Sequence, residues 1–140
     1  MSFDVLSDLN WLAVIVATLV YFAIGGLWYS PILFGKAWQR ASGMEMPEGQ
    51  RPGAAIYVVP LISAFLATVA TAMLAAATGS SDLGDGLVLG IVVAVGYAGA
   101  LTLLGSTFDR WPEPRVRFGI NFGYHLLGLI AAAVIVSVWD

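Results

Sequence analysis

Apolar residues are gathered into four long stretches, and every charged residue of the chain lies between or outside them. The stretches cover residues 10–30, 54–78, 86–107 and 118–138. A helix of about 20 residues rises about 30 Å, which matches the hydrocarbon core of a bilayer. A soluble protein of 140 residues is too small to bury four such helices on every side. The pattern therefore predicts an all-α integral membrane protein, a four-helix bundle in a single transmembrane domain over residues 1–140.

The cationic residues divide between two of the intervening segments. They are Lys36, Arg40 and Arg51 after the first stretch, and Arg110, Arg115 and Arg117 after the third. Because loops rich in Lys and Arg stay in the cytoplasm, residues 36–53 and 108–117 are predicted to be cytoplasmic loops and both termini to lie outside. The first ten residues carry no cation. The first stretch is therefore predicted to be a retained helix and not a signal peptide.

Tryptophan positions agree with this orientation, because the indole ring prefers the boundary between headgroups and hydrocarbon. The expected anchors are Trp11 and Trp139 at the outer edge, and Trp28, Trp38, Trp111, Lys36, Arg40 and Arg117 at the inner edge. A solvated connector with lipid-anchoring cations is the favoured interpretation of residues 35–42. A short helix along the inner headgroups is the competing interpretation.

Polar side chains within the stretches are candidates for function, since unpaired polar groups are costly in hydrocarbon. His125, the only histidine, lies about 12 Å beyond Arg117 by helical rise, near the bilayer centre. Asn121 lies one turn before it on the same helical face. Tyr21 and Tyr97 lie about halfway along the first and third stretches, so we expect them at the same depth. A hydroxyl from the second stretch can join them, from Ser63, Thr68 or Thr71.

Two interpretations of this polar layer are open. A closed hydrogen-bond network that orients the helices is favoured, because interhelical polar bonds commonly serve packing. The alternative is a ligand site or proton pathway made by His125, Asn121, Tyr21, Tyr97 and Thr68. No second His, Cys or carboxylate lies within the stretches, so no catalytic, metal or cofactor site is predicted and the protein is not expected to be an enzyme. Nucleic acid is not an expected partner, for want of a large basic cluster.

Small residues indicate where helices approach one another closely. The predicted packing positions are Gly25, Gly26, Gly86, Gly90, Gly119, Gly123 and Gly128, which include two GxxxG patterns. Contacts within one chain and between copies both remain open, and we expect self-association. At the helix ends, Ser7 or Asp8 is predicted to cap the first helix and Gly79 to end the second. The Ser30 hydroxyl is predicted to bond the Leu27 carbonyl that Pro31 leaves unpaired.

The N-terminal third carries a distinctive run of residues. It comprises Asn10-Trp11-Leu12-Ala13-Val14, Gly26-Leu27-Trp28-Tyr29-Ser30-Pro31 and Phe34-Gly35-Lys36-Ala37-Trp38. This run resembles the small bacterial membrane proteins grouped as domain of unknown function 1761, which have similar lengths and about four predicted spans. The resemblance implies the same architecture and brings no activity with it.

The resulting hypothesis is a self-associating structural or binding module of a bacterial cytoplasmic membrane. Its expected partners are membrane lipids and further copies of the chain, with room for an unidentified membrane partner. The alternative is a small permease or channel with a midplane polar site around His125.

Overall fold

The chain forms a bundle of long helices. The computed structural model describes residues 1–47, 49–50 and 53–139, and within these ranges it contains helices and no strands. The elements are the 3₁₀ helix η1 (Phe3–Ser7), α1 (Trp11–Trp28), α2 (Gly35–Ser42), α3 (Ala55–Thr78), α4 (Leu83–Val93), the π-helix η2 (Ala94–Gly99), α5 (Ala100–Phe108) and α6 (Pro114–Val138). Arg51 and Glu48, from the predicted first cytoplasmic loop, lie outside the described residues.

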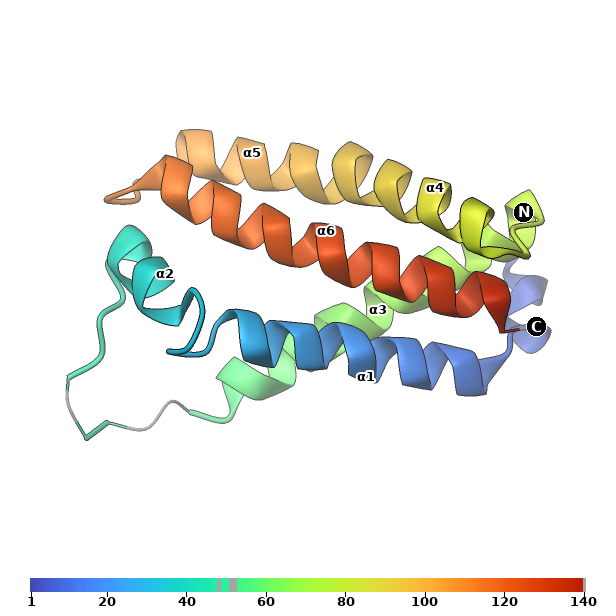
Figure 1. Cartoon of the computed structure of the whole chain (residues 1–140), viewed down its shortest axis with the longest axis horizontal. Helices are drawn as coiled ribbons and strands as arrows, with labels where there is room; N and C mark the ends of the chain where they lie inside the picture. The colour runs from blue at the N-terminus through green and yellow to red at the C-terminus, as the bar shows by residue number, and fades with distance from the viewer. Residues whose placement is uncertain (48, 51–52, 140) are drawn as a thin grey trace.

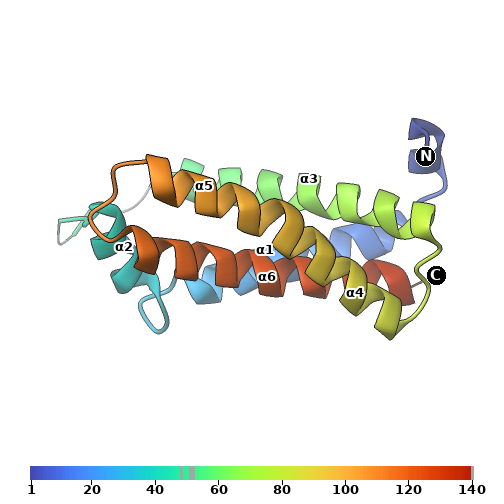
Figure 2. The same ribbon diagram turned by 90° about the horizontal axis from the view of Figure 1, so that it is seen from above.

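Four helices are long and apolar enough to cross a membrane, which confirms the predicted all-α, four-span architecture. They are α1, α3, α6 and the continuous helix Leu83–Phe108, in which η2 joins α4 to α5. Helix α6 is central, because it packs against each of the other three (Figures 1 and 2). The core where they meet is built largely from alanine and tyrosine: Ala17, Tyr21, Ala64, Val93, Ala94, Tyr124, Leu129 and Ala132.

Both chain ends lie at one end of the bundle, opposite α2 and the segment between α5 and α6 (Figure 1). The amide group of Asn10 donates to the carbonyl oxygen of Trp139, 2.9 Å away, and so fastens the two ends together. The Asn10 side chain also accepts from the Ala13 N–H and caps α1. The predicted caps Ser7 and Asp8 were wrong, because η1 occupies the residues before Asn10.

Helix α6 begins earlier than predicted. Its first residue is Pro114, whose fixed φ and missing N–H suit the first turn of a helix. The predicted loop 108–117 is therefore shorter, and Arg115 and Arg117 lie in the first turn of α6. Gly79 ends α3 in a left-handed conformation with φ of 70°, as predicted.

Residues 35–42 form the short helix α2 after the chain reversal that follows α1, so the favoured interpretation of a connector was wrong. The Ser30 hydroxyl donates to the Leu27 carbonyl oxygen at 2.6 Å, as predicted. Helix α2 is held to the start of α6, where the Glu113 N–H donates to the Ala41 carbonyl oxygen, 3.2 Å away.

Candidate functional site: a tyrosine–histidine–asparagine cluster between α1 and α6

A hydrogen bond between Tyr21 and His125 lies in the middle of the bundle. The Tyr21 hydroxyl is 2.7 Å from Nδ1 of His125, and one of the two donates, depending on the histidine tautomer. Only 2% of Tyr21 is exposed. Its ring lies directly over Gly128, where a Cβ atom would overlap Cδ2 and Cε2 of the tyrosine. A small residue on α6 therefore makes room for the ring that reaches His125.

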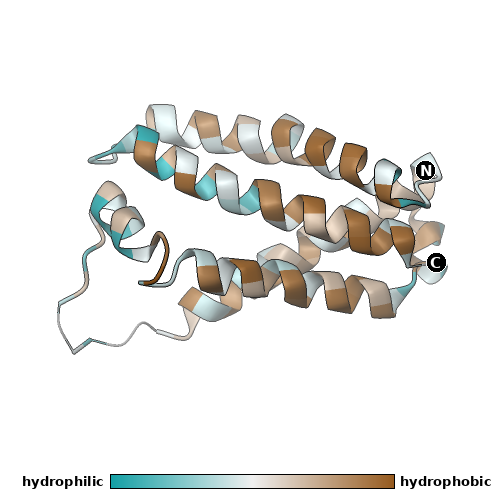
Figure 3. Ribbon diagram, in the orientation of Figure 1, coloured by the Kyte–Doolittle hydropathy of each residue, from teal (hydrophilic) through white to brown (hydrophobic). Residues whose placement is uncertain are grey.

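A second pair of bonds lies nearer the C-terminal end of α1 and the N-terminal end of α6. The Tyr29 hydroxyl donates to Oδ1 of Asn121 at 2.7 Å. The Trp28 indole N–H donates to the Ile120 carbonyl oxygen at 2.8 Å. They lie in the N-terminal half of α6, where Figure 3 shows the hydrophilic positions of this helix gathered. Together with the Tyr21–His125 bond they connect α1 to α6 along much of their length.

Tyr124 fills the space between these two levels. Its ring centroid is 5.3 Å from that of Tyr21, 5.4 Å from that of Tyr29 and 4.8 Å from that of His125. The ring also covers Gly25, where a Cβ atom would lie 2.9 Å from Cε2 of Tyr124. We refer to Tyr21, Tyr29, Asn121, Tyr124 and His125 as the polar cluster.

Sequence reasoning missed Tyr29 and Tyr124. Tyr29 had a usable signal, since Tyr21, Gly25 and Tyr29 are spaced by four and so lie on one face of a helix. Tyr124 had one as well, since it directly precedes His125 and lies three residues after Asn121, on the same side of the helix.

Tyr97 was wrongly placed in this cluster. Its side chain is 66% exposed on the outward side of the third span, although its depth is close to that expected. It belongs to η2, whose π-helical turn changes the rotation of every residue that follows. The buried residues of η2 are Ala94 and Gly99, and the latter lies against the ring of Phe122.

The three hydroxyl residues of α3 have different surroundings. Thr68 is fully buried, and its hydroxyl has no hydrogen-bond partner among the described residues. The Thr71 hydroxyl donates to the Ala67 carbonyl of its own helix, and Ser63 is exposed. None of the three bonds to the polar cluster.

The packing glycines fall into three groups. Gly86 and Gly90 bring α4 close to α6, since Cβ atoms there would lie 2.7 Å from Cα of Val134 and 2.6 Å from Cα of Ile130. Gly25, Gly123 and Gly128 lie beneath the rings of Tyr124, Trp28 and Tyr21. Gly26 and Gly119 have nothing within 4 Å of a Cβ position. Five of the seven are thus occupied by contacts within the chain.

The expected interface anchors lie at both ends of the bundle. The Trp11 indole N–H donates to the Leu6 carbonyl oxygen, and Trp139 is exposed at the same end of the bundle, where the termini lie. At the other end, Arg117 lies 3.8 Å over the Trp111 ring and its Nε–H donates to the Ser42 hydroxyl oxygen at 3.1 Å. The remaining anchors there are Lys36 and Arg40, which are exposed, and Trp38, whose ring contacts Tyr29 edge-on.

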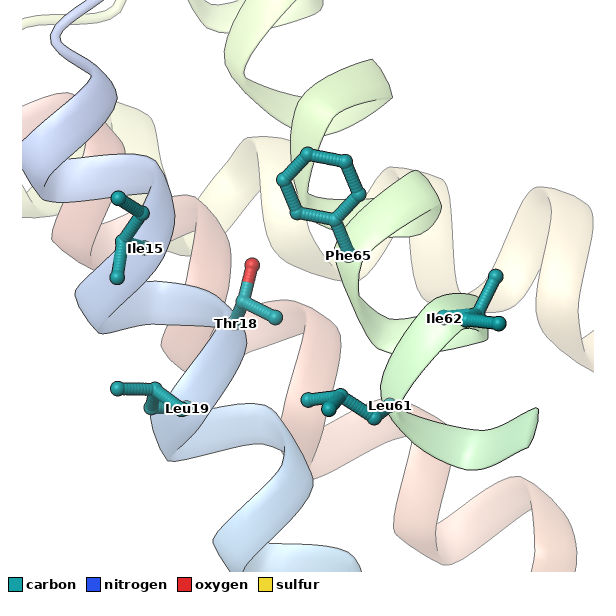
Figure 4. Close-up of a pocket in the computed structure, with 6 residues that line it drawn as sticks. All are labelled: Ile15, Thr18, Leu19, Leu61, Ile62 and Phe65. Carbon is teal, nitrogen blue, oxygen red and sulfur yellow. The ribbon is translucent and has the colours of Figure 1, made fainter. Parts of the chain in front are cut away.

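A cavity of about 310 Å³ lies between α1 and α3 (Figure 4). It is lined by Ile15, Thr18, Leu19, Leu61, Ile62 and Phe65. The one polar lining group, the Thr18 hydroxyl, donates to the Val14 carbonyl oxygen of its own helix. A smaller cavity of about 90 Å³ lies near the chain ends, beside Asp8 and Asn10. Neither cavity is lined by a member of the polar cluster.

Among the described residues, no group of three His, Cys, Asp or Glu is placed to hold a metal ion.

Comparison with known protein families matches residues 12–137 to the family described as "Protein of unknown function (DUF1761)". The chain belongs to the DUF1761 family. The match takes in all four spans, so the resemblance seen in the N-terminal third is confirmed over nearly the whole chain. No curated protein and no solved structure matches this DUF1761 member. Its function must therefore be inferred from its geometry.

Proposed function

We propose that this DUF1761 protein is a structural or binding module of a bacterial cytoplasmic membrane, that it works as a homo-oligomer, and that it is neither an enzyme nor a permease. The observation that carries the proposal is the internal pairing of the polar cluster. The Tyr21 hydroxyl pairs with His125 and the Tyr29 hydroxyl with Asn121, each at 2.7 Å. Polar groups that satisfy one another across two helices serve to fasten those helices together.

A transport site requires polar groups that can exchange their partner for a solute. In the polar cluster, the hydroxyls of Tyr21 and Tyr29 are already engaged, and the ring of Tyr124 packs against both tyrosines. Binding a solute there would first break bonds in a low-dielectric interior, where an unpaired polar group is costly. The arrangement therefore favours a fixed contact over a pathway.

The proposed orientation places α2 and the start of α6 in the cytoplasm and both termini outside. All the described Lys and Arg residues lie at that one end of the bundle, on α2 or between Arg110 and Arg117. Because positive residues are retained on the cytoplasmic side, their grouping supports this orientation.

The experiment is reconstitution of the purified protein in lipid vesicles at decreasing protein-to-lipid ratio. Counting photobleaching steps of a single attached fluorophore is expected to show more than one copy per assembly. A pH-sensitive dye inside the vesicles is expected to report no more proton flux than in protein-free vesicles. A single photobleaching step per assembly at every protein-to-lipid ratio would contradict the proposed homo-oligomer.

A permease is the second candidate, and two observations favour it. The Thr68 hydroxyl is buried without a partner among the described residues, and η2 interrupts the third span with a π-helical turn, a feature frequent at functional sites. The same vesicles test this candidate with protons or small polar solutes. Flux that disappears in both His125→Ala and Thr68→Val would replace the structural proposal, whereas flux unchanged by both would exclude this site.

A further inference from the structure

The third span is the least covered of the four. Only 17% of its most apolar window is buried within the chain, against 33% for α6. At its centre, Tyr97 is 66% exposed and Ala100 is exposed beside it. Gly96 has nothing within 4 Å of a Cβ position. We call these three residues the Tyr97 face.

The Tyr97 hydroxyl is an unusual group to leave in this position. Tyr97 lies eleven residues from Phe108, the nearer end of the span, which corresponds to roughly 16 Å of helix. A tyrosine side chain is much too short to carry its hydroxyl to the headgroups from there. Its hydroxyl makes no hydrogen bond to any part of the chain that the structure describes. Lipid tails offer neither donor nor acceptor, so an unpaired hydroxyl at this depth is costly.

We propose that a second copy of the chain packs against the Tyr97 face, so that the two third spans form the contact of a dimer. This inference rests on the proposed self-association and assigns it to one face. Copies with the same orientation are related by a two-fold axis along the membrane normal, which brings each residue opposite its counterpart at equal depth. A hydroxyl is both donor and acceptor, so one Tyr97 hydroxyl donates to the other and each gains one hydrogen bond.

The backbone around Tyr97 suits this approach. Gly96 and Ala100 are spaced by four, and small residues at that spacing let two membrane helices come close. On either side, Val92 and Leu104 are exposed and apolar, and provide packing surface away from the centre. A lipid would satisfy these apolar side chains equally well, but only a protein supplies a partner for the phenol.

Cross-linking tests the face directly, because the chain contains no cysteine and each introduced thiol is unique. Gly96→Cys and Ala100→Cys are compared with Leu66→Cys, an exposed position on α3. After oxidation in vesicles, covalent dimers are expected for the first two variants and not for the third. If photobleaching shows oligomers but cross-links form only through Leu66→Cys, or at none of the three positions, the chain self-associates and the Tyr97 face is not the contact. Single copies by photobleaching would overturn both.

The role of the hydroxyl is tested by Tyr97→Phe, which keeps the ring. Dimerisation in vesicles is expected to weaken about threefold to tenfold, as for other interhelical hydrogen bonds in membranes. The matched control is Tyr57→Phe, because Tyr57 is 60% exposed but is the third residue of α3, near the headgroups. Equal dimer affinity of Tyr97→Phe and the unmodified chain would contradict the pairing of the two phenols.

Discussion

At the scale of single residues, Tyr21 carries two contacts that are usually made by different side chains. Its ring fills the space left by Gly128, and its hydroxyl bonds His125 across the same interface. A phenylalanine ring would fill the space over Gly128 without bonding His125, and a serine would offer a hydroxyl without filling that space. Phenol is suited to a packed membrane interior because it combines a large apolar surface with one directed polar group.

Tyr21→Phe separates the two contacts. The ring still fits over Gly128, but Nδ1 of His125 loses its partner, so we expect the free energy of unfolding to fall by about 1 kcal/mol. Reversible unfolding in detergent micelles measures the change, with Tyr57→Phe as a control expected to be neutral. A double-mutant cycle with His125→Leu should show coupling between the two positions. Additive effects would mean that the bond contributes nothing to stability.

Gly128→Ala tests the space beneath the ring. The added methyl group would overlap Tyr21, whose ring is buried and cannot swing away, so we expect a loss of about 1–3 kcal/mol from overpacking. Gly119→Ala on the same helix is the control, because nothing lies within 4 Å of its Cβ position. Alanine forms helix more readily than glycine, so this control should be neutral or slightly stabilising. Equal behaviour of the two variants would contradict the close contact.

At the scale of elements, α6 has a different kind of partner on each side. It meets α4 through the backbone, across Gly86 and Gly90, and meets α1 through aromatic rings and hydrogen bonds. At its first turn it also holds α2, through Arg117 and Glu113. One helix therefore connects the spans with the short helix at the cationic end of the bundle.

Arg117→Ala is expected to release α2 from the start of α6. The arginine both stacks on Trp111 and donates to Ser42, so its loss removes two contacts at once. Hydrogen exchange should become faster at the amides of residues 35–42 and stay unchanged within the spans. Arg115→Ala removes the same charge from an exposed side chain and is the matched control. Equal exchange in both variants would show that α2 is held by other contacts.

At the scale of the whole molecule, the sequence predicted well how deep in the membrane each residue lies. It predicted poorly which side of its helix faces the bundle interior. Hydropathy and helical rise correctly gave four spans, and they placed Tyr21 and His125 at similar depths. Direction around a helix requires one side to be more polar than the other, and these spans are apolar on nearly every side. Tyr97 was therefore assigned to the interior, and the π-helical turn that rotates its surroundings leaves no sign in the composition.

The same limit applies to the glycines, for which spacing identified packing positions without their partners. Gly90 and Gly119 both belong to GxxxG patterns, yet Gly90 meets the backbone of α6 and Gly119 meets nothing within 4 Å. Which GxxxG pattern forms a close contact depends on which helix packs against it in the folded chain. That information lies in the pairing of distant segments and cannot be read from one helix at a time.

Orientation in the membrane is a property of the whole molecule, and it can be tested without knowledge of the activity. The two chain ends share one end of the bundle, so they must lie on the same side of a membrane that the four helices cross. We expect Ser2→Cys to react with an impermeant maleimide in intact cells, and Glu45→Cys to react only after the cells are opened. Both positions are exposed, so a difference between them reflects the membrane and not burial in the protein. Reaction of Glu45→Cys alone in intact cells would reverse the proposed orientation. Substituting Arg110 and Arg115 by Ala while introducing Lys near residue 2 should raise the reversed fraction, because loop cations determine the side that is retained.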